Sequence, residues 1–148
     1  MGKVKAVLDT NILVSLLFKK ALAKEISKAM EEKSVEFYSS EEILRELARV
    51  LTYPKIEEIF EKAEVEKRTV LESLTEILKV VNPKVRVNVI KIDPSDNKVL
   101  ECALEAGAKY LISGDKHLIA LREFRKVEIV TVKEFLEKLD FLKKVVRE

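Results

Sequence analysis

Short runs of consecutive apolar residues alternate along the chain with longer segments in which apolar residues recur every three to four positions. The first pattern is typical of strands buried in a parallel sheet, and the second is typical of helices that bury one side. Strands are therefore predicted over residues 3–8, 35–38, 85–92, 110–113 and 127–132. Helices are predicted over residues 10–18, 21–33, 41–51, 54–60, 64–81, 93–107, 116–122 and 133–146.

Several predicted helix ends carry residues with known preferences for those positions. Ser40 is a good N-cap, Pro83 interrupts a helical pattern, and Gly107 can end one. Strands that alternate with helices predict an α/β fold: a three-layer α/β/α sandwich around a mainly parallel, Rossmann-like twisted sheet of about five strands. No linker rich in Gly or Ser divides the sequence. Residues 1–148 are therefore expected to form a single domain.

Composition narrows the function without defining it. Apolar residues make up 47% of the chain and charged residues 36%, as in a globular protein. The formal net charge of +2 is far below that of proteins that bind DNA by charge alone, so a nucleic-acid partner would need clustered basic residues or a metal ion. The single cysteine, Cys102, lies in a helical pattern and is expected to be a packed thiol. Because no apolar run reaches about 18 residues and no signal-peptide layout is present, a cytoplasmic protein without a membrane segment is expected.

Four acidic residues far apart in the sequence fall where an α/β fold can bring them together. Asp9 follows the first predicted strand and Asp115 follows the fourth. Ligands of open parallel sheets bind beyond the C-terminal ends of the strands, so both residues are expected at the same rim. Asp96 falls near the centre of the apolar face of its helix, and Glu46 at the edge of the apolar stripe of its own. An acid that points inward needs a partner, because burial of an unpaired carboxylate is costly.

Each of these acids also has an ordinary structural explanation. Asp93 can be an N-cap with the following proline at the first helical position, and Asp96 can complete a capping pair three residues later. Asp115 can cap the short helix after it, and Glu46 taken alone is typical of a surface acid. Asp9, at the end of a buried strand, is the hardest to explain in this way. All of these explanations have to hold together for a functional cluster to be absent.

Four carboxylates gathered in a partly dry cleft would repel one another. A hard cation such as Mg²⁺ or Mn²⁺ relieves that repulsion, since carboxylate oxygens are its preferred ligands. The chain has one histidine and one cysteine, so a zinc site is not expected. The histidine, His117, is expected to be a surface residue rather than a substrate contact. The acids therefore predict a Mg²⁺ or Mn²⁺ site.

Four pieces of sequence carry these features in a fixed order along the chain. They are VLDTN at residues 7–11, EEILRELARVL at 41–51, DPSDNKVLECALEAGAKYLISGDKHL at 93–118 and VEIVTVKEFL at 127–136. Together they resemble the PIN-domain ribonuclease family, and the resemblance runs from residue 4 to residue 136, nearly the whole chain. The nearest look-alikes are prokaryotic single-domain, VapC-like members, many of which are toxins of toxin–antitoxin pairs.

Carried over position by position, the resemblance implies an acidic metal site formed by Asp9, Glu46, Asp96 and Asp115. It further implies that Asn11 and Ser113 are polar neighbours of this site, with Ser113 where the family often has Thr. Asp93 would be an outer ligand through water. Residues 18–23 lack the Gly and Pro expected between the first two helices of the nearest relatives, which puts substrate entry there in doubt but not the chemistry.

The resemblance implies a metal-dependent endoribonuclease that hydrolyses RNA phosphodiester bonds with water and needs no covalent nucleophile. Basic residues near the acids in sequence are expected to contact phosphates, namely Arg45, Arg49, Lys98, Lys116 and Arg122. An antitoxin protein is the partner expected of a toxin. The apolar final helix, residues 133–146, can either cover the sheet or join a homodimer.

Two other classes of function remain open from the sequence. A PIN-like fold can serve as an RNA- or protein-binding module without cutting, although such a protein is expected to lack one or more of the acids. An Asp after the first strand also begins haloacid-dehalogenase-type phosphatases and phosphoacceptor receiver domains. The phosphatases need a second Asp where this chain has Asn11. Receiver domains need paired acids after the first strand and a Lys at the end of a late one, and residues 127–132 offer none.

Overall fold

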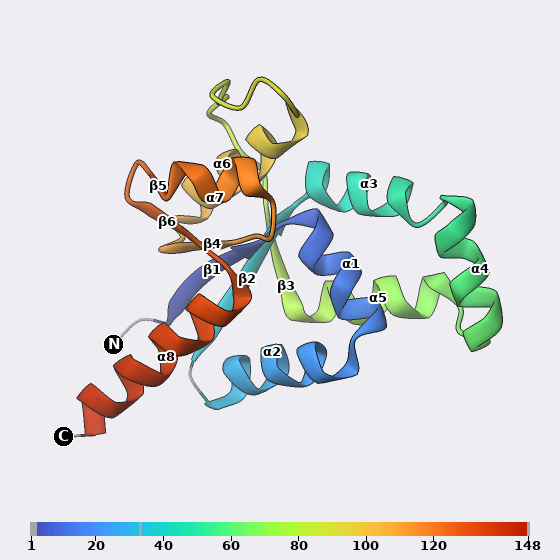
Figure 1. The fold of residues 1–148 in the computed structure, drawn as a ribbon, viewed down its shortest axis with the longest axis horizontal. Coiled ribbons are helices and arrows are strands. Elements are labelled where there is room, and N and C mark those ends of the chain that lie inside the picture. Colours follow the sequence, from blue (N-terminus) through green and yellow to red (C-terminus); the bar gives the residue numbers. More distant parts are fainter. Residues whose placement is uncertain (1–2, 33, 148) are drawn as a thin grey trace.

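The computed structural model describes residues 3–32 and 34–147, with side chains up to residue 141. The described residues form a six-stranded sheet flanked by helices (Figure 1). The strands are β1 (Val4–Leu8), β2 (Val35–Ser40), β3 (Leu78–Val81), β4 (Tyr110–Ile112), β5 (Glu123–Phe124) and β6 (Val127–Val130). The helices are α1 (Thr10–Phe18), α2 (Lys20–Glu32), α3 (Glu41–Val50), α4 (Pro54–Ala63), α5 (Lys67–Ile77), α6 (Ser95–Ala106), α7 (Lys116–Leu121) and α8 (Val132–Arg147).

Strand β1 lies inside the sheet, whose order is β3-β2-β1-β4-β6-β5. It pairs in parallel with β2 on one side and β4 on the other, so the C-terminal ends of all three strands lie at one rim. Strand order changes direction between β1 and β4, which is where open parallel sheets bind ligands. The predicted α/β fold with a mainly parallel sheet is confirmed. The sheet has one strand more than the five expected, because two unpredicted strands, β3 and β5, are present and one predicted strand, over residues 85–92, is not formed. The two-residue β5 pairs antiparallel with β6 and is too short to leave a pattern.

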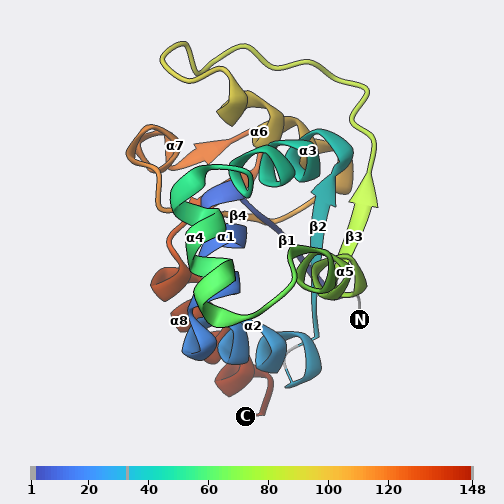
Figure 2. The ribbon, with the colours of Figure 1, turned by 90° about the vertical axis from the view of Figure 1, so that its right-hand side faces the viewer.

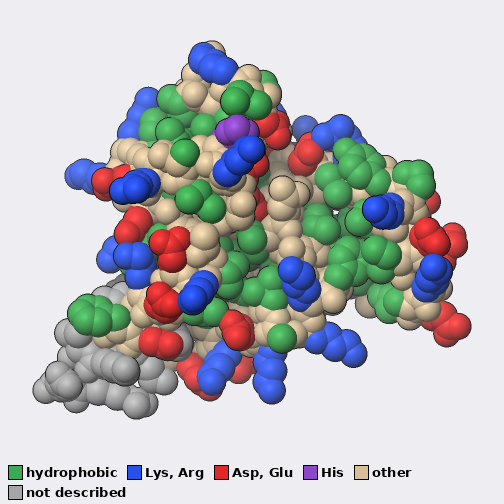
Figure 3. Space-filling model, in the orientation of Figure 1, with side chains coloured by type: hydrophobic (Ala, Val, Ile, Leu, Met, Phe, Trp, Pro, Cys, Tyr) green, Lys and Arg blue, Asp and Glu red, His purple; other side chains and the backbone are tan. Residues whose placement is uncertain are grey.

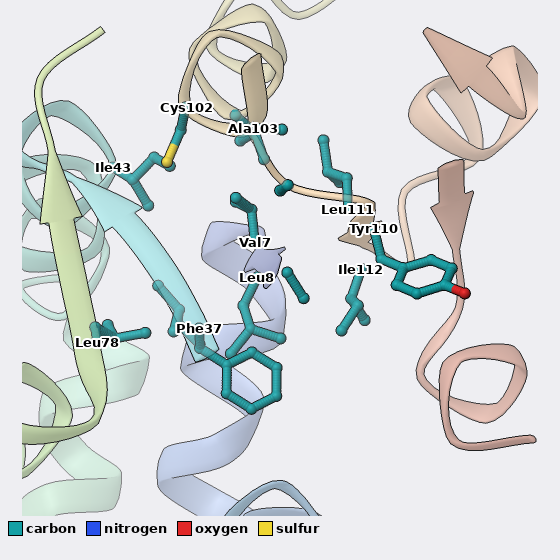
Figure 4. Close-up of a cluster of buried hydrophobic side chains, with 14 of the residues drawn as sticks. Val7, Leu8, Phe37, Ile43, Leu78, Cys102, Ala103, Tyr110, Leu111 and Ile112 are labelled. Atoms are coloured by element: carbon teal, nitrogen blue, oxygen red, sulfur yellow. The ribbon is translucent and has the colours of Figure 1, made fainter. Parts of the chain in front are cut away.

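The hydrophobic core lies on both faces of the sheet, since alternate residues of a strand point to opposite sides. Figure 4 shows Val7 and Leu111 directed towards α6, and Phe37 directed away from it. On that second face the rings of Phe37 and Tyr110 pack edge-on against Phe135 of α8, with ring centroids 6.1 and 5.5 Å apart. The sheet therefore separates α6 from α8, which produces the three predicted layers.

Two predicted helix ends are confirmed in atomic detail. The hydroxyl of Ser40 accepts a hydrogen bond from the backbone N–H of Ile43 at 3.2 Å and so caps α3. Gly107 ends α6 with a φ of 66°, a left-handed conformation that costs glycine little. Both ends matter for the site described below, because α3 carries Glu46 and α6 carries Asp96.

The long helix predicted over residues 64–81 is wrong at both ends. Glu64 adopts a left-handed φ of 56° that ends α4, so α5 begins only at Lys67. After Ile77 the chain extends as β3 and pairs with β2, with Leu78 opposite Phe37. The free edge of β2 offers hydrogen bonds that a continued helix would leave unmade, and this tertiary pairing overrides the helical spacing.

The strand predicted over residues 85–92 is also wrong, because the described chain is irregular there. Residues 82–94, here called the strap, leave the end of β3 and pass beyond α3 to reach α6 (Figure 2). Val87 and Ile90 are the buried apolar residues of the strap, a spacing of three that suits contact with a helix rather than a sheet. The strap packs on α6, where side chains of Glu101 and Asn97 accept backbone N–H groups of the strap, as a neighbouring strand would otherwise do.

The first half of α8 covers the sheet through the buried residues Phe135 and Leu139. Phe141, further along, is 66% exposed. Side chains after residue 141 lie outside the described residues, as does Lys33, the predicted end of the second helix. The homodimer therefore stays a prediction. Among the described helices, α8 included, none has the length and hydrophobicity that crossing a membrane requires.

Candidate functional site

Asp9 is the first residue after the central strand β1, and it is buried at 4% exposure. Its backbone N–H donates to the carbonyl of Ile112 at 3.1 Å, which ties it to the end of β4. Its Oδ1 caps α1 by accepting the N–H of Ile12 at 2.9 Å. Burial raises the pKa of Asp9, and the hydrogen bonds from Ser113 and Ile12 oppose that rise.

A chain of hydrogen bonds joins Asp9 to Asp115 across the rim. The hydroxyl of Ser113, which is fully buried, donates to Asp9 Oδ2. The same hydroxyl accepts the backbone N–H of Asp115 at 2.9 Å. Asp115 Oδ1 in turn caps α7 by accepting the N–H groups of His117 and Leu118, at 2.7 and 3.4 Å. The capping explanation for Asp115 is therefore confirmed, and its other oxygen, Oδ2, takes no part in the cap.

Asp96 lies in the first turn of α6 and enters the site from the side of that helix. Its Oδ2 is buried and has no hydrogen-bond partner. No side chain caps the start of α6 by a hydrogen bond, so the capping explanation for Asp96 is wrong. The N-cap predicted for Asp93 is also wrong, since α6 begins at Ser95 and its N-cap position is Pro94. Asp93 instead forms a local turn, in which its Oδ1 accepts the N–H of Ser95 at 3.1 Å and the hydroxyl of Ser95 at 2.6 Å. Loss of solvent, followed by the charges of Asp115, Asp93 and Asp9, raises the pKa of Asp96 to about 7.

Glu46 comes from α3 and is held by its neighbour on the same helix. Both of its carboxylate oxygens accept from the guanidinium of Arg49, at 2.7 and 2.8 Å. Its side chain is 26% exposed, which agrees with its predicted place at the edge of the apolar stripe of α3. Glu46 is therefore available at the surface of the cleft but is neutralised by an arginine as it stands.

One small cleft of about 70 Å³ at this rim brings the predicted acids together. It is lined by Asp9, Thr10, Asn11, Glu46, Val50, Asp93, Ser95, Asp96, Val99 and Asp115. Figure 3 shows acidic side chains in the hollow between the part of the molecule formed by α7 and the part formed by α3 and α4. Ser113 lies behind this cleft as the buried link between two of the acids.

The donors of this cleft fit a hard divalent cation by their chemistry. Asp96 Oδ2 is an orphaned buried oxygen, and mutual repulsion contributes to the raised pKa values of Asp9 and Asp96. A cation removes both costs. Within the described residues, no three acidic, histidine or cysteine side chains are arranged to enclose an ion as they stand. Arg49 on Glu46 and the helix caps on Asp9 and Asp115 are the contacts that would have to adjust.

A larger groove of about 800 Å³ adjoins the acidic cleft, and Glu46 lines both. We call it the α3–α6 groove; its lining residues are Glu42, Arg45, Glu46, Arg49, Arg86, Val87, Asn88, Pro94, Asn97, Lys98 and Glu101. Three of the predicted phosphate contacts, Arg45, Arg49 and Lys98, line it. Lys116 and Arg122 are exposed and line neither the groove nor the cleft. Arg86 lies outside the predicted set, and its place in the groove depends on how the strap packs.

Cys102 and His117, whose roles the sequence leaves open, differ in how far they are buried. Cys102 is fully buried and faces Ile43 (Figure 4). Burial raises its pKa to about 12, so the expected packed thiol is confirmed. His117 is half-buried next to Asp115, and its backbone rather than its ring makes the contact with that residue.

A family model and two solved structures show which known proteins this chain is similar to. The model of the PIN domain family matches residues 5–117. A chain in the crystal structure of VapBC2 from Rickettsia felis, bound to a DNA fragment from their promoter, has a TM-score of 0.58 at 14% identity, over 85% of this chain and 97% of that chain. The T. brucei RRP44 PIN domain has a TM-score of 0.53 at 12% identity, over 99% of this chain and 86% of that chain. No curated protein sequence matches. At these low identities, the likeness of this chain to the two solved structures is a likeness in fold alone.

Proposed function

The chain belongs to the PIN domain family, and we propose that it is a metal-dependent endoribonuclease whose active site is the acidic cleft. The observation that carries the proposal is the meeting of four acids from separate segments in that cleft: Asp9, Glu46, Asp96 and Asp115. A binding module would gain nothing from the buried, unpaired oxygen of Asp96, whereas a metal site needs such an oxygen.

In this proposal each residue has a role set by its contacts. Asp9, Asp96 and Asp115 would hold Mg²⁺ or Mn²⁺ through their carboxylate oxygens. A bound cation would activate water and neutralise charge on the scissile phosphate. Glu46 would bind the ion or orient the attacking water. Ser113 fixes the orientation of the Asp9 carboxylate through its hydrogen bond.

Polar residues around the acids complete the proposed site. Asn11 and Asp93 line the cleft and would orient waters there, Asp93 as an outer contact of the ion. Lys116 stands beside Asp115 at the start of α7, and Arg122 ends the same helix. We assign both, like the basic residues of the groove, to contacts with RNA phosphates.

The test is cleavage of labelled single-stranded RNA by the purified protein with Mg²⁺ or Mn²⁺, read on a denaturing gel. Asp9→Asn and Asp96→Asn are each expected to lower the rate by at least about a hundredfold, since each removes a charge that holds the ion. EDTA is expected to abolish cleavage by the wild type.

Glu72→Gln serves as the matched control, because Glu72 is an exposed acid on α5 with 65% of its side chain accessible. It should cleave like the wild type. Cleavage that persists in both Asp→Asn variants, or in EDTA, would overturn the proposed metal site. A folded wild-type protein that cleaves no RNA would favour the non-cutting binding module instead.

We assign the protein to the cytoplasm as the toxin of a toxin–antitoxin pair, with an antitoxin protein as its partner. The support is the likeness in fold to a chain of VapBC2 together with the sequence pattern of the acids. Expression of the wild type in a bacterial host is expected to slow growth, and Asp96→Asn is expected not to. Co-expression of the product of the neighbouring open reading frame should restore growth. Normal growth with wild type alone would count against the toxin role.

A further inference from the structure

The α3–α6 groove has three walls, each from a different part of the chain. Arg45 and Arg49 lie on α3, Arg86 on the strap, and Lys98 on α6. The groove is more than ten times as large as the acidic cleft and opens next to it at Glu46. A polymeric substrate whose reacting group lies in the cleft would therefore extend along the groove.

Positive side chains outnumber negative ones in this groove, four to three, and the negative ones already serve as their partners. Glu42 accepts from Arg86 at 2.8 Å and also from Lys98. Glu101, which is buried, accepts from the same guanidinium at 3.1 Å. The carboxylates thus hold the cations in place, while 68% of the Arg86 side chain and 46% of that of Lys98 remain accessible.

Arg86 is positioned by the backbone on either side of it. The N–H of Val87 donates to Glu101 at 2.9 Å, and the N–H of Lys84 donates to Glu105 at 2.9 Å. A guanidinium on a strap fixed in this way binds phosphate without much loss of freedom, so it suits a specific contact more than a mobile surface lysine does.

The lining of the groove is suited to phosphates rather than to bases. Among the described residues that line it, none is aromatic, so it offers no platform for base stacking. The amide of Asn97 is already used, because its oxygen accepts the N–H groups of Val89 and Ile90 and its nitrogen donates to the carbonyl of Ile90.

We propose that the α3–α6 groove binds the sugar–phosphate backbone of single-stranded RNA, with Arg86 of the strap as its main phosphate ligand and Lys98 of α6 as a second. This inference rests on the proposed function, because it places the RNA on one side of the acidic cleft. Phosphates exchange with Glu42 as the partners of both cations. A flexible single strand can follow walls made of two helices and a strap, and recognition of its backbone is tolerant of base sequence.

The experiment measures equilibrium binding of a short fluorescently labelled single-stranded RNA in EDTA, by anisotropy, over a series of salt concentrations. EDTA removes metal-dependent cleavage, so binding is read apart from activity. Arg86→Gln is expected to weaken binding about five- to tenfold and to reduce the slope of log K against log salt by about 0.7, the value for one lost phosphate contact on a single strand. Lys98→Gln is expected to act in the same direction, by about threefold.

Arg68→Gln is the matched control, since Arg68 is an exposed arginine of α5 that pairs with Glu72 at 3.2 Å and does not line the groove. It should bind RNA like the wild type. Wild-type affinity and salt slope in both groove variants would overturn the proposal, and so would an equal loss in Arg68→Gln. If Arg86→Gln fails to fold, Lys98→Gln decides, because its exposed ion pair contributes little to stability.

The outcome separates this proposal from the proposed nuclease. RNA binding that depends on Arg86, in a protein that never cleaves RNA, would support RNA binding in the groove and reject the proposed nuclease activity. Metal-dependent cleavage together with unchanged RNA binding by both groove variants would reject RNA binding in the groove and support the proposed nuclease activity.

Discussion

Asp96 bears a charge that its surroundings oppose. Its Oδ2 is buried and lacks a hydrogen-bond partner, and the charges of Asp115, Asp93 and Asp9 add to the effect of lost solvent on its pKa. Buried polar atoms in folded proteins nearly always have partners, so an unpaired carboxylate oxygen costs stability unless something absent from the bare chain compensates it. The residue is therefore expected to weaken the metal-free fold while it serves the site.

Asp96→Asn is expected to be more stable than the wild type at neutral pH in EDTA. The folded pKa of about 7 lies above the ordinary 3.8, so the wild type has the full stabilising effect of the bound proton only below about pH 4 and loses it as the pH rises through about 7. Asparagine has nearly the shape of the neutral, protonated acid and cannot ionise. Its advantage should grow over this range to about 2 kcal/mol, allowing for partial exposure. Thermal unfolding across the range measures it, and a difference independent of pH would contradict it.

Among the elements, the strap shows most clearly how tertiary packing can overrule a local pattern. Its alternating valines have the period of a strand, but side chains of α6 accept its backbone N–H groups in place of a neighbouring strand. Asn97, Glu101 and Glu105 follow one another at intervals of four on α6 and so share one face. The spacing is visible in the sequence, whereas the segment of backbone that these residues bind depends on tertiary packing.

The acids are more predictable than the cations for a related reason. Asp9 and Asp115 follow strands and Asp96 lies on an inward helix face, and these are local features that the fold class converts into a common rim. The direction of an exposed basic side chain has no such constraint. Lys116 is next to an acid in sequence and does not line the cleft, whereas Arg86 is distant from most of the acids and lies in the groove beside them.

At the scale of the whole molecule, the acidic cleft exists only when the sheet and its helices are assembled. Its lining comes from the ends of β1 and β4, from α3 and from α6, segments that span most of the chain. A ligand of this cleft binds the native state and has no comparable site in the unfolded chain. Its binding free energy is therefore added to the free energy of unfolding of the whole domain.

Mg²⁺ or Mn²⁺ is accordingly expected to raise the melting temperature of the wild type. A cation at about a hundred times its dissociation constant adds about 2.7 kcal/mol, which corresponds to a rise of a few degrees for a domain of this size. Asp9→Asn and Asp96→Asn should lose the rise, since each removes a negative charge from the proposed metal site. Glu58→Gln should keep it, because Glu58 is an exposed acid of α4 outside the cleft. Calorimetry with and without EDTA measures the shift, and a wild-type melting temperature insensitive to both ions would show that the acids do not form a metal site.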